Sequence, residues 1–331
     1  MSFERVQVLD QASDSEVKRY YNEKYAQDYM GDCYGVWSHT GAQLLRVSET
    51  LDQVGIVPDR ILDYGCGQGA WIDILSARFP KSRIYGLDIS DVAIERAKSR
   101  FPIYEFRTFD GEMADFPDEH FDLIFSYHVL EHVVDIKLTI ANICRMLKKG
   151  GYACLIFPCG NQGSFEEKAM KWIDGGTTTT PEGRKIYFYE QAIGHLRRMT
   201  SKETIDLFKG SGLSLVSECY SSQFLGWVDW LVRAHDRSTI NSVLGGKRAN
   251  SSPAKVKLVI TKQLLLALNW LVAKKSLDLS KRRSLLKTIV AYLLKGCGIG
   301  CDGILKRVAI EEWRLFKQKL NGSEQFLVFQ K

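Results

Sequence analysis

A glycine-rich turn between an apolar strand and a helix constrains the fold of this chain more than any other feature. The strand is predicted over 61–64, and the turn that follows reads Gly65-Cys-Gly67-Gln-Gly69-Ala70. Glycine lacks a Cβ atom, so such a turn lets a ligand approach backbone N–H groups at the start of a helix. The run also satisfies the G-x-G-x-x-G/A pattern, and Asp88 follows at about the 20-residue spacing of a ribose-binding acid. The pattern predicts a nucleoside-type cofactor, and NAD fits it as well as others do.

Strand and helix signals alternate after this turn. Ser90 is a predicted helix N-cap, and Thr200 and Glu203 form a capping box. Strands that alternate with helices of this length form a parallel sheet with helices on both faces. The predicted fold class is therefore α/β, a doubly wound, Rossmann-like sheet. We predict strands over 61–64, 84–88, 103–109, 121–127, 152–157, 213–220 and 325–329, and helices over 14–30, 70–79, 91–100, 135–148 and 200–210.

Composition excludes several other classes of protein. Of the 331 residues, 45% are hydrophobic and 25% are charged, which is typical of a globular chain with a sizeable core. The eight cysteines are scattered and form no CxxC pair, so neither a disulfide framework nor a zinc site is expected. The first residues are polar and charged, which argues against a signal peptide. We expect a cytoplasmic protein, with peripheral attachment to a membrane left open.

The last third of the chain is basic. Residues 238–331 contain 18 Lys and Arg against 5 Asp and Glu, a balance of +13, whereas residues 1–237 contain 27 against 34, a balance of −7. Residues 221–322 are leucine-rich and predicted to be helical. Their most apolar stretch, 258–273, is shorter than the roughly 20 residues that a bilayer span needs, so we do not expect a transmembrane helix. The segment could instead form a lid, lie on an anionic membrane surface, or bind a phosphorylated or lipid-linked substrate. Nucleic acid is not an expected partner, because no recognised binding motif accompanies the charge.

Polar residues follow the ends of the predicted strands. Asp63 precedes the glycine turn, where a carboxylate would attract a cationic ligand and repel a pyrophosphate. Asp88 ends the second strand, Asp110 follows the third, and Ser126 lies near the end of the fourth, which continues into His128-Val-Leu-Glu-His-Val133. This set resembles the class I S-adenosylmethionine-dependent methyltransferase superfamily, of the small-molecule type, over residues 55–220 and the final strand.

The resemblance implies a fold and a cofactor. The sheet would have seven strands, with the last inserted antiparallel between the fifth and the sixth. Residues 1–50 would form an N-terminal helical cap, residues 51–220 with 323–331 the methyltransferase core, and residues 221–322 a basic helical insertion. S-adenosylmethionine would be the cofactor. Asp63, Gly65 and Gly67 would face its methionine part, Asp88 its ribose hydroxyls and Asp110 its adenine amino group; Ile89, Gly111 and Ser126 complete the predicted cofactor-binding set.

The residues that could act on an acceptor cluster after the fourth strand. They are His128, Glu131 and His132, joined by His195 further along the chain. Glu131 and His132 could brace the loop, an imidazole could act as a general base, or the group could hold a divalent metal. The metal alternative rests on similarity to a Glu-x-x-Glu-His motif, in which His128 replaces the first glutamate here. Our prediction is that His128 and His132 are catalytic and that no metal takes part.

An aromatic N-terminal segment could cover the cofactor. Tyr21, Tyr25, Trp37 and His39 resemble the cap of small-molecule methyltransferases, although an aromatic stripe could equally be core. The predicted function is transfer of a methyl group to a small-molecule or lipid-linked acceptor, with oxygen preferred to nitrogen or carbon. The alternatives are an NAD-dependent oxidoreductase, for which no hydride-acceptor site is visible, and a non-catalytic adaptor that binds the cofactor.

Overall fold

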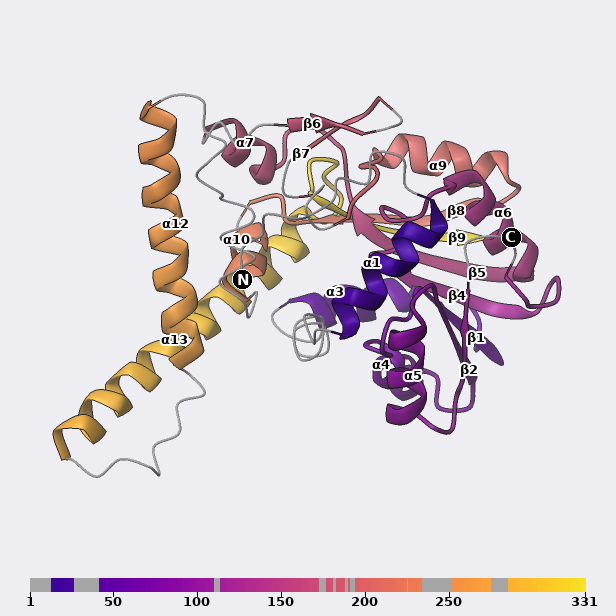
Figure 1. The fold of residues 1–331 in the computed structure, drawn as a ribbon, viewed down its shortest axis with the longest axis horizontal. Helices are drawn as coiled ribbons and strands as arrows, with labels where there is room; N and C mark the ends of the chain where they lie inside the picture. Colours follow the sequence, from indigo (N-terminus) through magenta and orange to yellow (C-terminus); the bar gives the residue numbers. More distant parts are fainter. Residues whose placement is uncertain are drawn as a thin grey trace.

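One mixed sheet organises the part of the chain that the structure describes. The computed structural model describes residues 13–26, 42–109, 114–172, 177–180, 183–187, 190, 194–224, 226–233, 252–274 and 285–331. Within them, seven strands pair in the order β3-β2-β1-β4-β5-β9-β8 (Figure 1). Only β9 runs antiparallel to its neighbours, between β5 and β8, which confirms the predicted fold class. The strands are β1 Arg60–Tyr64, β2 Arg83–Asp88, β3 Glu105–Thr108, β4 Phe121–Tyr127, β5 Leu147–Pro158, β8 Ser214–Ser221 and β9 Glu324–Gln330.

Alternate residues of the central strands supply two separate hydrophobic cores. In β1, Ile61 belongs to one core and Leu62 to the other. The first core is covered by α3 (Gln43–Leu51), α4 (Ile72–Arg78), α5 (Asp91–Arg100) and the end of α13 (Leu285–Phe316). The second core is covered by α6 (Ile136–Met146) and α9 (Ser201–Gly210). The near-continuous apolar strands are therefore buried on both faces, as the doubly wound prediction requires.

The predicted helix over 135–148 is too long at its C-terminal end. In the structure α6 ends at Met146, and β5 begins directly at Leu147, which pairs with Phe121 of β4. The side chain of Lys331 supplies the reason, because its Nζ donates to the carbonyl oxygens of Cys144 (2.8 Å) and Leu147 (2.7 Å). These carbonyl groups would otherwise lack partners at a helix end. A residue at the far end of the chain thus fixes this boundary.

Residues 159–199, for which no strand or helix is predicted and a long loop is therefore expected, contain regular structure. It holds α7 (Phe165–Trp172) and a hairpin of β6 (Thr177–Thr179) and β7 (Lys185–Tyr187). The turn of this hairpin is closed by the N–H of Thr180, which donates to the Arg184 carbonyl at 2.7 Å. Three-residue strands carry too little periodicity to be read from a sequence, so this prediction missed them.

The basic segment forms three helices in its described part: α10 (Gly226–Arg233), α12 (Ser252–Ala273) and α13. Helix α12 starts six residues before the apolar run read from the sequence, with Pro253 in its first turn, where proline is tolerated. Its residues 255–273 are long and apolar enough to cross a membrane by length and composition alone, so the expected length was wrong. One such helix is weak support for a span. The predicted division of the chain into a cap, a core and an insertion stays a prediction.

The end of α13 is anchored in the first core. The indole of Trp313 packs on Phe326 of β9, with ring centroids 5.0 Å apart, and its Nε1 donates to Glu49 Oε2 at 2.8 Å. Lys317 Nζ donates to the same carboxylate oxygen at 2.6 Å. Helix α13 therefore leads the chain from the projecting helices back into the sheet.

Replacement of Trp313 tests this anchor. Trp313→Ala should lower the free energy of unfolding by roughly 3–5 kcal/mol, because it empties a fully buried site beside β9. Leu315→Ala, two residues away and 70% exposed, is the matched control and should change it by less than about 0.5 kcal/mol. Denaturant unfolding of both variants checks the difference. Equal stability of the two would mean that α13 is not docked on the sheet.

Candidate functional site

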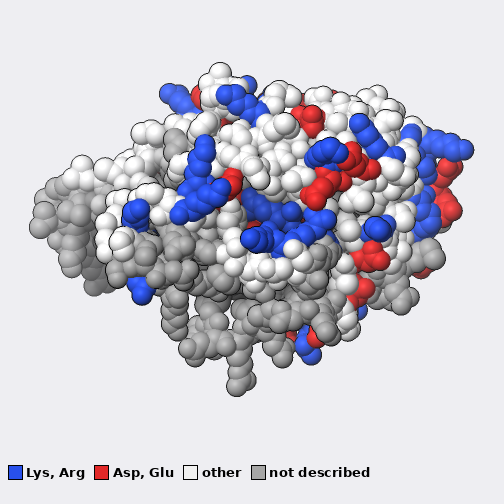
Figure 2. Space-filling view, turned by 90° about the horizontal axis from the view of Figure 1, so that it is seen from above, with Lys and Arg blue, Asp and Glu red and all other residues white. Residues whose placement is uncertain are grey.

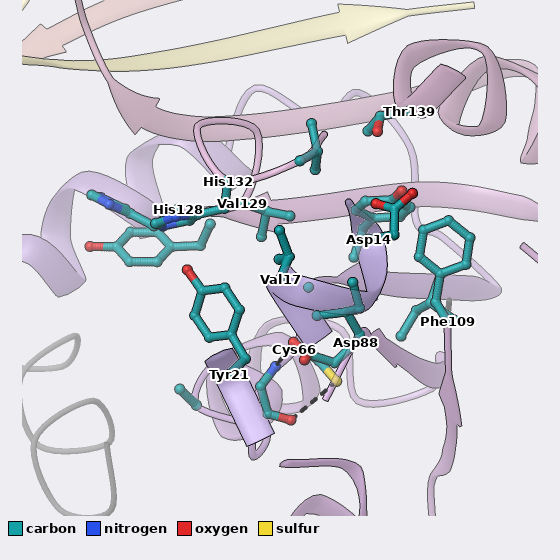
Figure 3. A pocket seen from close by; sticks show the side chains of 18 of the residues that line it. Asp14, Val17, Tyr21, Cys66, Asp88, Phe109, His128, Val129, His132 and Thr139 are labelled. Carbon is teal, nitrogen blue, oxygen red and sulfur yellow. Dashed lines mark hydrogen bonds between the residues drawn. The ribbon is translucent and has the colours of Figure 1, made fainter. Parts of the chain in front are cut away.

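A pocket opens at the carboxyl ends of β1, β2 and β4 (Figure 3). The empty space in it, including its opening to solvent, is about 1050 Å³. In Figure 3 the two histidines lie on one side of the pocket, Asp14 and Phe109 on the other, and Tyr21 between them. The lining residues named below are Asp14, Val17, Tyr21, Tyr25, Gly65, Gly67, Asp88, Ile89, His128, Val129, His132 and Thr139.

The glycine turn forms part of the pocket wall. Gly65 and Gly67 have positive φ angles of 80° and 52°. A Cβ atom on Gly65 would lie 2.1 Å from Val129 Cγ2, and one on Gly67 would lie 2.5 Å from the Tyr25 hydroxyl oxygen. Glycine is required here both for the backbone conformation and for the close approach of the loop after β4 and of α1.

Asp88 is placed as predicted, at the end of β2 in the pocket wall. Its Oδ2 accepts from the Gly67 N–H (2.8 Å), and its Oδ1 accepts from the Ser90 N–H (2.9 Å). Burial raises the pKa of Asp88 to about 6, although these backbone hydrogen bonds act in the opposite direction. Each oxygen has two lone pairs, so the carboxylate can still accept hydrogen bonds from two vicinal hydroxyl groups. The neighbouring Ile89 also lines the pocket.

Two other predicted cofactor residues lie behind the wall. The carboxyl group of Asp63 is buried, and its Oδ2 has no hydrogen-bond partner among the described residues. Burial, and then the charge of Asp88, raise the pKa of Asp63 to about 8. Ser126 donates its hydroxyl to the Tyr64 carbonyl at 3.0 Å and is not part of the pocket lining. Asp63 and Ser126 therefore lie next to the glycine turn but do not line the pocket.

Asp110 and Gly111 lie outside the described residues. Their predicted contact with an adenine ring stays a prediction. The glycine turn, Asp88 and Ile89 by themselves fit a ribose-containing cofactor. Asp88, ionised at neutral pH, places a negative charge in the pocket wall, which suits a cationic group such as a sulfonium or an ammonium better than a pyrophosphate; Asp63, with its pKa raised to about 8, is protonated there.

His128 lies between two carboxylates. Its Nε2 is 2.9 Å from Glu324 Oε1 of β9, and its Nδ1 is 3.2 Å from Glu131 Oε1. Burial would lower the pKa of His128, but Glu131 and Glu324 outweigh that effect and raise the pKa to about 10. A protonated imidazole has no lone pair to accept a proton. Of the two histidines predicted to be catalytic, His132 is therefore the one that could act as a general base.

His132, in contrast to His128, is neutral. Its Nδ1 lies 3.0 Å from the Gly194 carbonyl, which can only accept, so Nδ1 carries the proton and Nε2 keeps a lone pair. Burial lowers the pKa of His132 to about 3, against the attraction of Glu131, so the ring is neutral. Its Nε2 is 3.8 Å from Glu131 Oε1, and the ring lines the pocket beside Tyr21. A neutral imidazole whose lone pair at Nε2 lies beside a carboxylate can take up a proton, although the lowered pKa makes His132 a weak base.

Glu131, His132 and His195 could also hold a metal ion. Each offers one ligand atom, and these atoms lie within 4.8 Å of one another. Glu131 is 1% exposed, and neither of its oxygens makes a hydrogen bond within the described ranges. The chemistry of this donor set, two imidazoles and a carboxylate, suits a divalent ion such as zinc.

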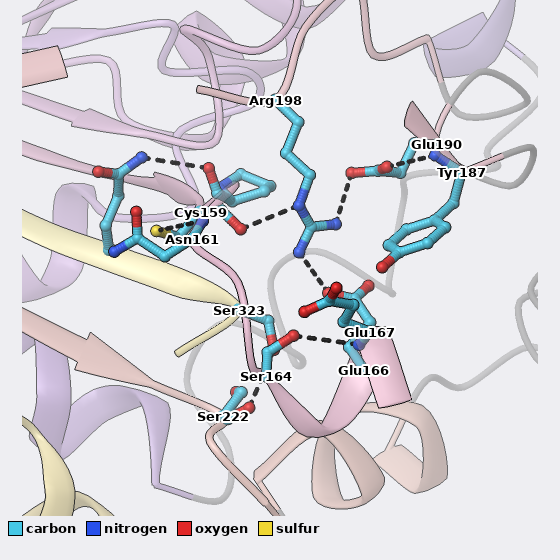
Figure 4. Close-up of polar contacts among 12 residues, drawn as sticks. Cys159, Asn161, Ser164, Glu166, Glu167, Tyr187, Glu190, Arg198, Ser222 and Ser323 are labelled. Atoms are coloured by element: carbon cyan, nitrogen blue, oxygen red, sulfur yellow. Dashed lines mark hydrogen bonds and ion pairs between the residues drawn. The ribbon is translucent and has the colours of Figure 1, made fainter. Parts of the chain in front are cut away.

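A buried ion cluster around Arg198, which the sequence did not predict, lies beside His195; Figure 4 shows Arg198 with Glu166 and Glu190. Arg198 forms ion pairs with Glu190, at 2.8 Å, and with Glu166 of α7. Its Nε donates to the Cys159 carbonyl at 2.9 Å, and Glu190 in turn lies 3.4 Å from His195 Nδ1. These residues are spread over 40 positions of the predicted loop, so no spacing indicated that they meet.

Helix α1 (Asp14–Ala26) covers the pocket as the predicted cap would. Asp14, Val17, Tyr21 and Tyr25 line the pocket at successive helical turns. The helix is held on the core by an ion pair between Lys18 and Asp91, at 3.0 Å.

The cap prediction was incomplete in several places. Asp14, Val17 and Thr139 of α6 were missed as lining residues. The stripe of Tyr21 and Tyr25, extended backward at the same helical spacing, would have indicated Val17 and Asp14. Trp37 and His39 lie outside the described residues.

Comparison with known proteins places this site in context. A family model described as a methyltransferase domain matches residues 36–218, which is more than half of the chain. The malonyl-[acyl-carrier protein] O-methyltransferase of Legionella pneumophila is 29% identical over 133 residues, which cover 38% of this chain and 45% of that protein. The juvenile hormone acid O-methyltransferase of Bombyx mori is 32% identical over 132 residues, which cover 36% and 47%. The matched part thus spans about half the length of these relatives.

A solved structure agrees in fold over a longer range. The [4+2]-cyclase SpnF covers 97% of both chains at 14% identity, with a TM-score of 0.53. At this identity the likeness concerns the fold alone.

The raised pKa of Asp88 predicts how cofactor affinity depends on pH. Asp88 is ionised above about pH 6 and protonated below it, so affinity for S-adenosylhomocysteine should be full at neutral pH and fall as the pH drops through about 6. Asp88→Ala should weaken binding at pH 7.5 by roughly 10- to 150-fold, the equivalent of about 1.5–3 kcal/mol. Titration calorimetry across this pH range measures both effects.

Two control variants make this test specific. Asp73→Asn, a largely exposed carboxylate on α4, should bind as the wild type does. Asp63→Asn should keep the pH step near 6, because that step belongs to Asp88. An Asp88→Asn variant with an unchanged pH step would show that another group titrates.

Proposed function

Because this chain belongs to the methyltransferase domain family, we propose that it transfers a methyl group from S-adenosylmethionine to an oxygen atom of a small-molecule acceptor. The domain is that of an S-adenosylmethionine-dependent enzyme, which decides against the NAD-dependent oxidoreductase alternative. The proposal concerns two features of the acceptor: it is a small molecule, and the atom that takes the methyl group is oxygen. The neutral His132 in the pocket wall, backed by Glu131, is the observation that carries it.

The residues of this chain would orient the cofactor and the acceptor and would exclude water from the pocket. When bound, the cofactor supplies a methyl group that its sulfonium already activates, so little further chemistry is needed. The glycine turn and Asp88 would hold its nucleoside and methionine parts at the floor of the pocket, and Tyr21 and Tyr25 of α1 would cover them. Aromatic faces also attract a cationic group, which suits a sulfonium. Exclusion of water from the pocket would prevent side reactions of the activated methyl group.

His132 would remove the proton from a hydroxyl acceptor. Its lone pair is on Nε2, and the proton on Nδ1 is retained by the Gly194 carbonyl. As His132 takes up the proton at Nε2, the buried carboxylate of Glu131 would stabilise the charge that develops on the ring. His128 would have a positioning role, because it orients Glu131 and links it to Glu324 of β9.

The relatives are consistent with oxygen as the acceptor atom. Both sequence relatives described above carry O-methyltransferase in their names, one for a malonyl group and one for an acid. A carboxylate acceptor would need no base, since it is already ionised at neutral pH. Hydroxyl and carboxyl acceptors can therefore be told apart by their dependence on His132. A lipid-linked acceptor is the second candidate, favoured by the exposed apolar surface of α12.

Removal of the proposed base is the direct test. With hydroxyl acceptors, His132→Ala should lower kcat by roughly 10²–10⁴-fold while affinity for S-adenosylhomocysteine stays unchanged, because the lost group acts on the acceptor. His120→Ala, a partly exposed histidine outside the pocket lining, is the control and should retain activity. Transfer of a labelled methyl group to panels of phenols, alcohols and carboxylic acids gives the rates.

The outcomes separate the competing roles. Full activity of His132→Ala toward hydroxyl acceptors would contradict the base. Activity that is lost in EDTA and restored by zinc or magnesium would replace the base with a metal site at Glu131, His132 and His195. Binding of S-adenosylhomocysteine without turnover on any panel would favour the non-catalytic adaptor.

A further inference from the structure

The outer face of α12 is apolar and exposed. Val256, Val259, Ile260 and Leu264 follow one another at helical spacing, with Trp270 further along the helix. Leu264 is 63% exposed, and of residues 255–273 only 12% are buried. A soluble helix normally turns its apolar stripe to the core and its polar residues to water. An exposed surface of this kind marks a site of interaction.

The opposite face of α12 is already in use. Leu265 and Val272 pack in a small core with Trp227 and Val232 of α10. The side-chain amide of Asn269 donates to the Val232 carbonyl at 2.9 Å, which fixes the rotation of the helix about its axis. Because Leu265, Asn269 and Val272 are held on the inner side of α12, the apolar residues on its outer side face away from this small core.

Helix α13 adds further exposed apolar residues. Tyr292, Leu293, Ile299 and Ile304 are exposed, and a Cβ atom added to Gly300 would meet no atom within 4 Å. Figure 1 shows α12 and the first half of α13 projecting away from the sheet as two arms. The exposed apolar residues of the two arms, Val256, Val259, Ile260, Leu264, Trp270, Tyr292, Leu293, Ile299 and Ile304, are together called the arm surface below.

The arms carry a net positive charge. Residues 252–274 and 285–304 contain six lysines and one acidic residue, Asp302; the lysines are Lys255, Lys257, Lys262, Lys274, Lys287 and Lys295. Two lysines lie beside tryptophan rings, with Lys257 Nζ 5.2 Å from the Trp172 centroid and Lys274 Nζ 4.7 Å from the Trp270 centroid. Tryptophan and lysine together are typical of a membrane–water interface. In Figure 2, Lys and Arg side chains also gather across the middle of the adjoining face.

We propose that the arm surface docks on a bilayer that contains anionic lipids, with α12 lying in the plane of the interface. Apolar side chains would enter the boundary between head groups and acyl chains, and the lysines would contact anionic head groups. This inference does not depend on which acceptor is methylated.

Other occupants fit the surface less well. A transmembrane orientation of α12 would pull Leu265 and Val272 out of their core and place Lys262 near the bilayer centre. A second copy of the chain would bring two surfaces of net positive charge together, and like charges across an interface oppose association. The excess of lysine over acid therefore favours anionic lipid.

Sedimentation of the full chain with vesicles tests the proposal. Binding should occur with phosphatidylcholine vesicles that contain phosphatidylglycerol, weaken with added salt and be much weaker with phosphatidylcholine alone. Lys255→Ser and Lys257→Ser should each weaken binding about fivefold, the equivalent of roughly 1 kcal/mol. The pair Ile260→Ser with Leu264→Ser should abolish it. Val57→Ser, at an even more exposed apolar residue outside the arms, and Lys209→Ser on α9 are the controls and should bind as the wild type does.

Three results would overturn the proposal. The first is that no vesicle binds the protein at low salt. The second is that binding resists both salt and carbonate, which would show a span rather than docking. The third is a dimer that Leu264→Ser dissociates while vesicle binding is absent, which would assign the surface to a second copy. Unchanged affinity for S-adenosylhomocysteine in each variant confirms that the fold is retained, so a failure of docking is separate from a failure of the methyltransferase assignment.

Discussion

The reversal of strand order between β1 and β4 is the constraint on which the site depends. From β1 the chain proceeds outward through β2 and β3, and then returns to the other side of β1 with β4 and β5. The helices of the first half therefore cover one face of the sheet, and α6 covers the other. Loops that leave β1 and β4 in opposite directions cannot close over the gap between them. The pocket lies in this gap, with the glycine turn on one side and the loop of His128 on the other.

Charge then divides the pocket into two regions with different chemistry. Asp63 and Asp88 lie beneath the turn, where burial keeps the pKa of both carboxyl groups high. Across the pocket, Glu131 and Glu324 are matched by the imidazolium of His128, and the neutral His132 is next to them. The ionised Asp88 suits a cationic cofactor, whereas a neutral imidazole beside the Glu131 carboxylate could take up a proton. Two neighbouring histidines of the same loop thus have opposite protonation states because their neighbours differ.

The sequence could predict the parts of this molecule that local physics determines. Strand and helix periodicity, the Ser90 cap and the Thr200–Glu203 capping box are local signals, and the structure contains each of these elements. Asp88 could be found because its spacing from the glycine turn is set by one β-α-β unit.

Contacts between distant residues could not be predicted in this way. Glu324 lies 196 positions from His128, and its carboxylate, together with that of Glu131, makes His128 a cation rather than a base. The ion cluster around Arg198 joins residues of a segment without periodicity. The end of α6 depends on Lys331. Without knowledge of which distant side chains meet, neither a protonation state nor such a boundary can be assigned.

The position of β9 has a consequence for synthesis of the chain. In the described sheet β8 pairs with β9 and with no other strand, and residues 222–323 separate the two in sequence. At roughly 5–20 residues per second, a ribosome needs several seconds to make that segment. During this time β5 is an open sheet edge, and β8, already synthesised, has no strand to join. Both are templates for unwanted pairing with other chains. The apolar arms are also made within this interval, so the nascent chain passes through its most aggregation-prone state just before the sheet closes.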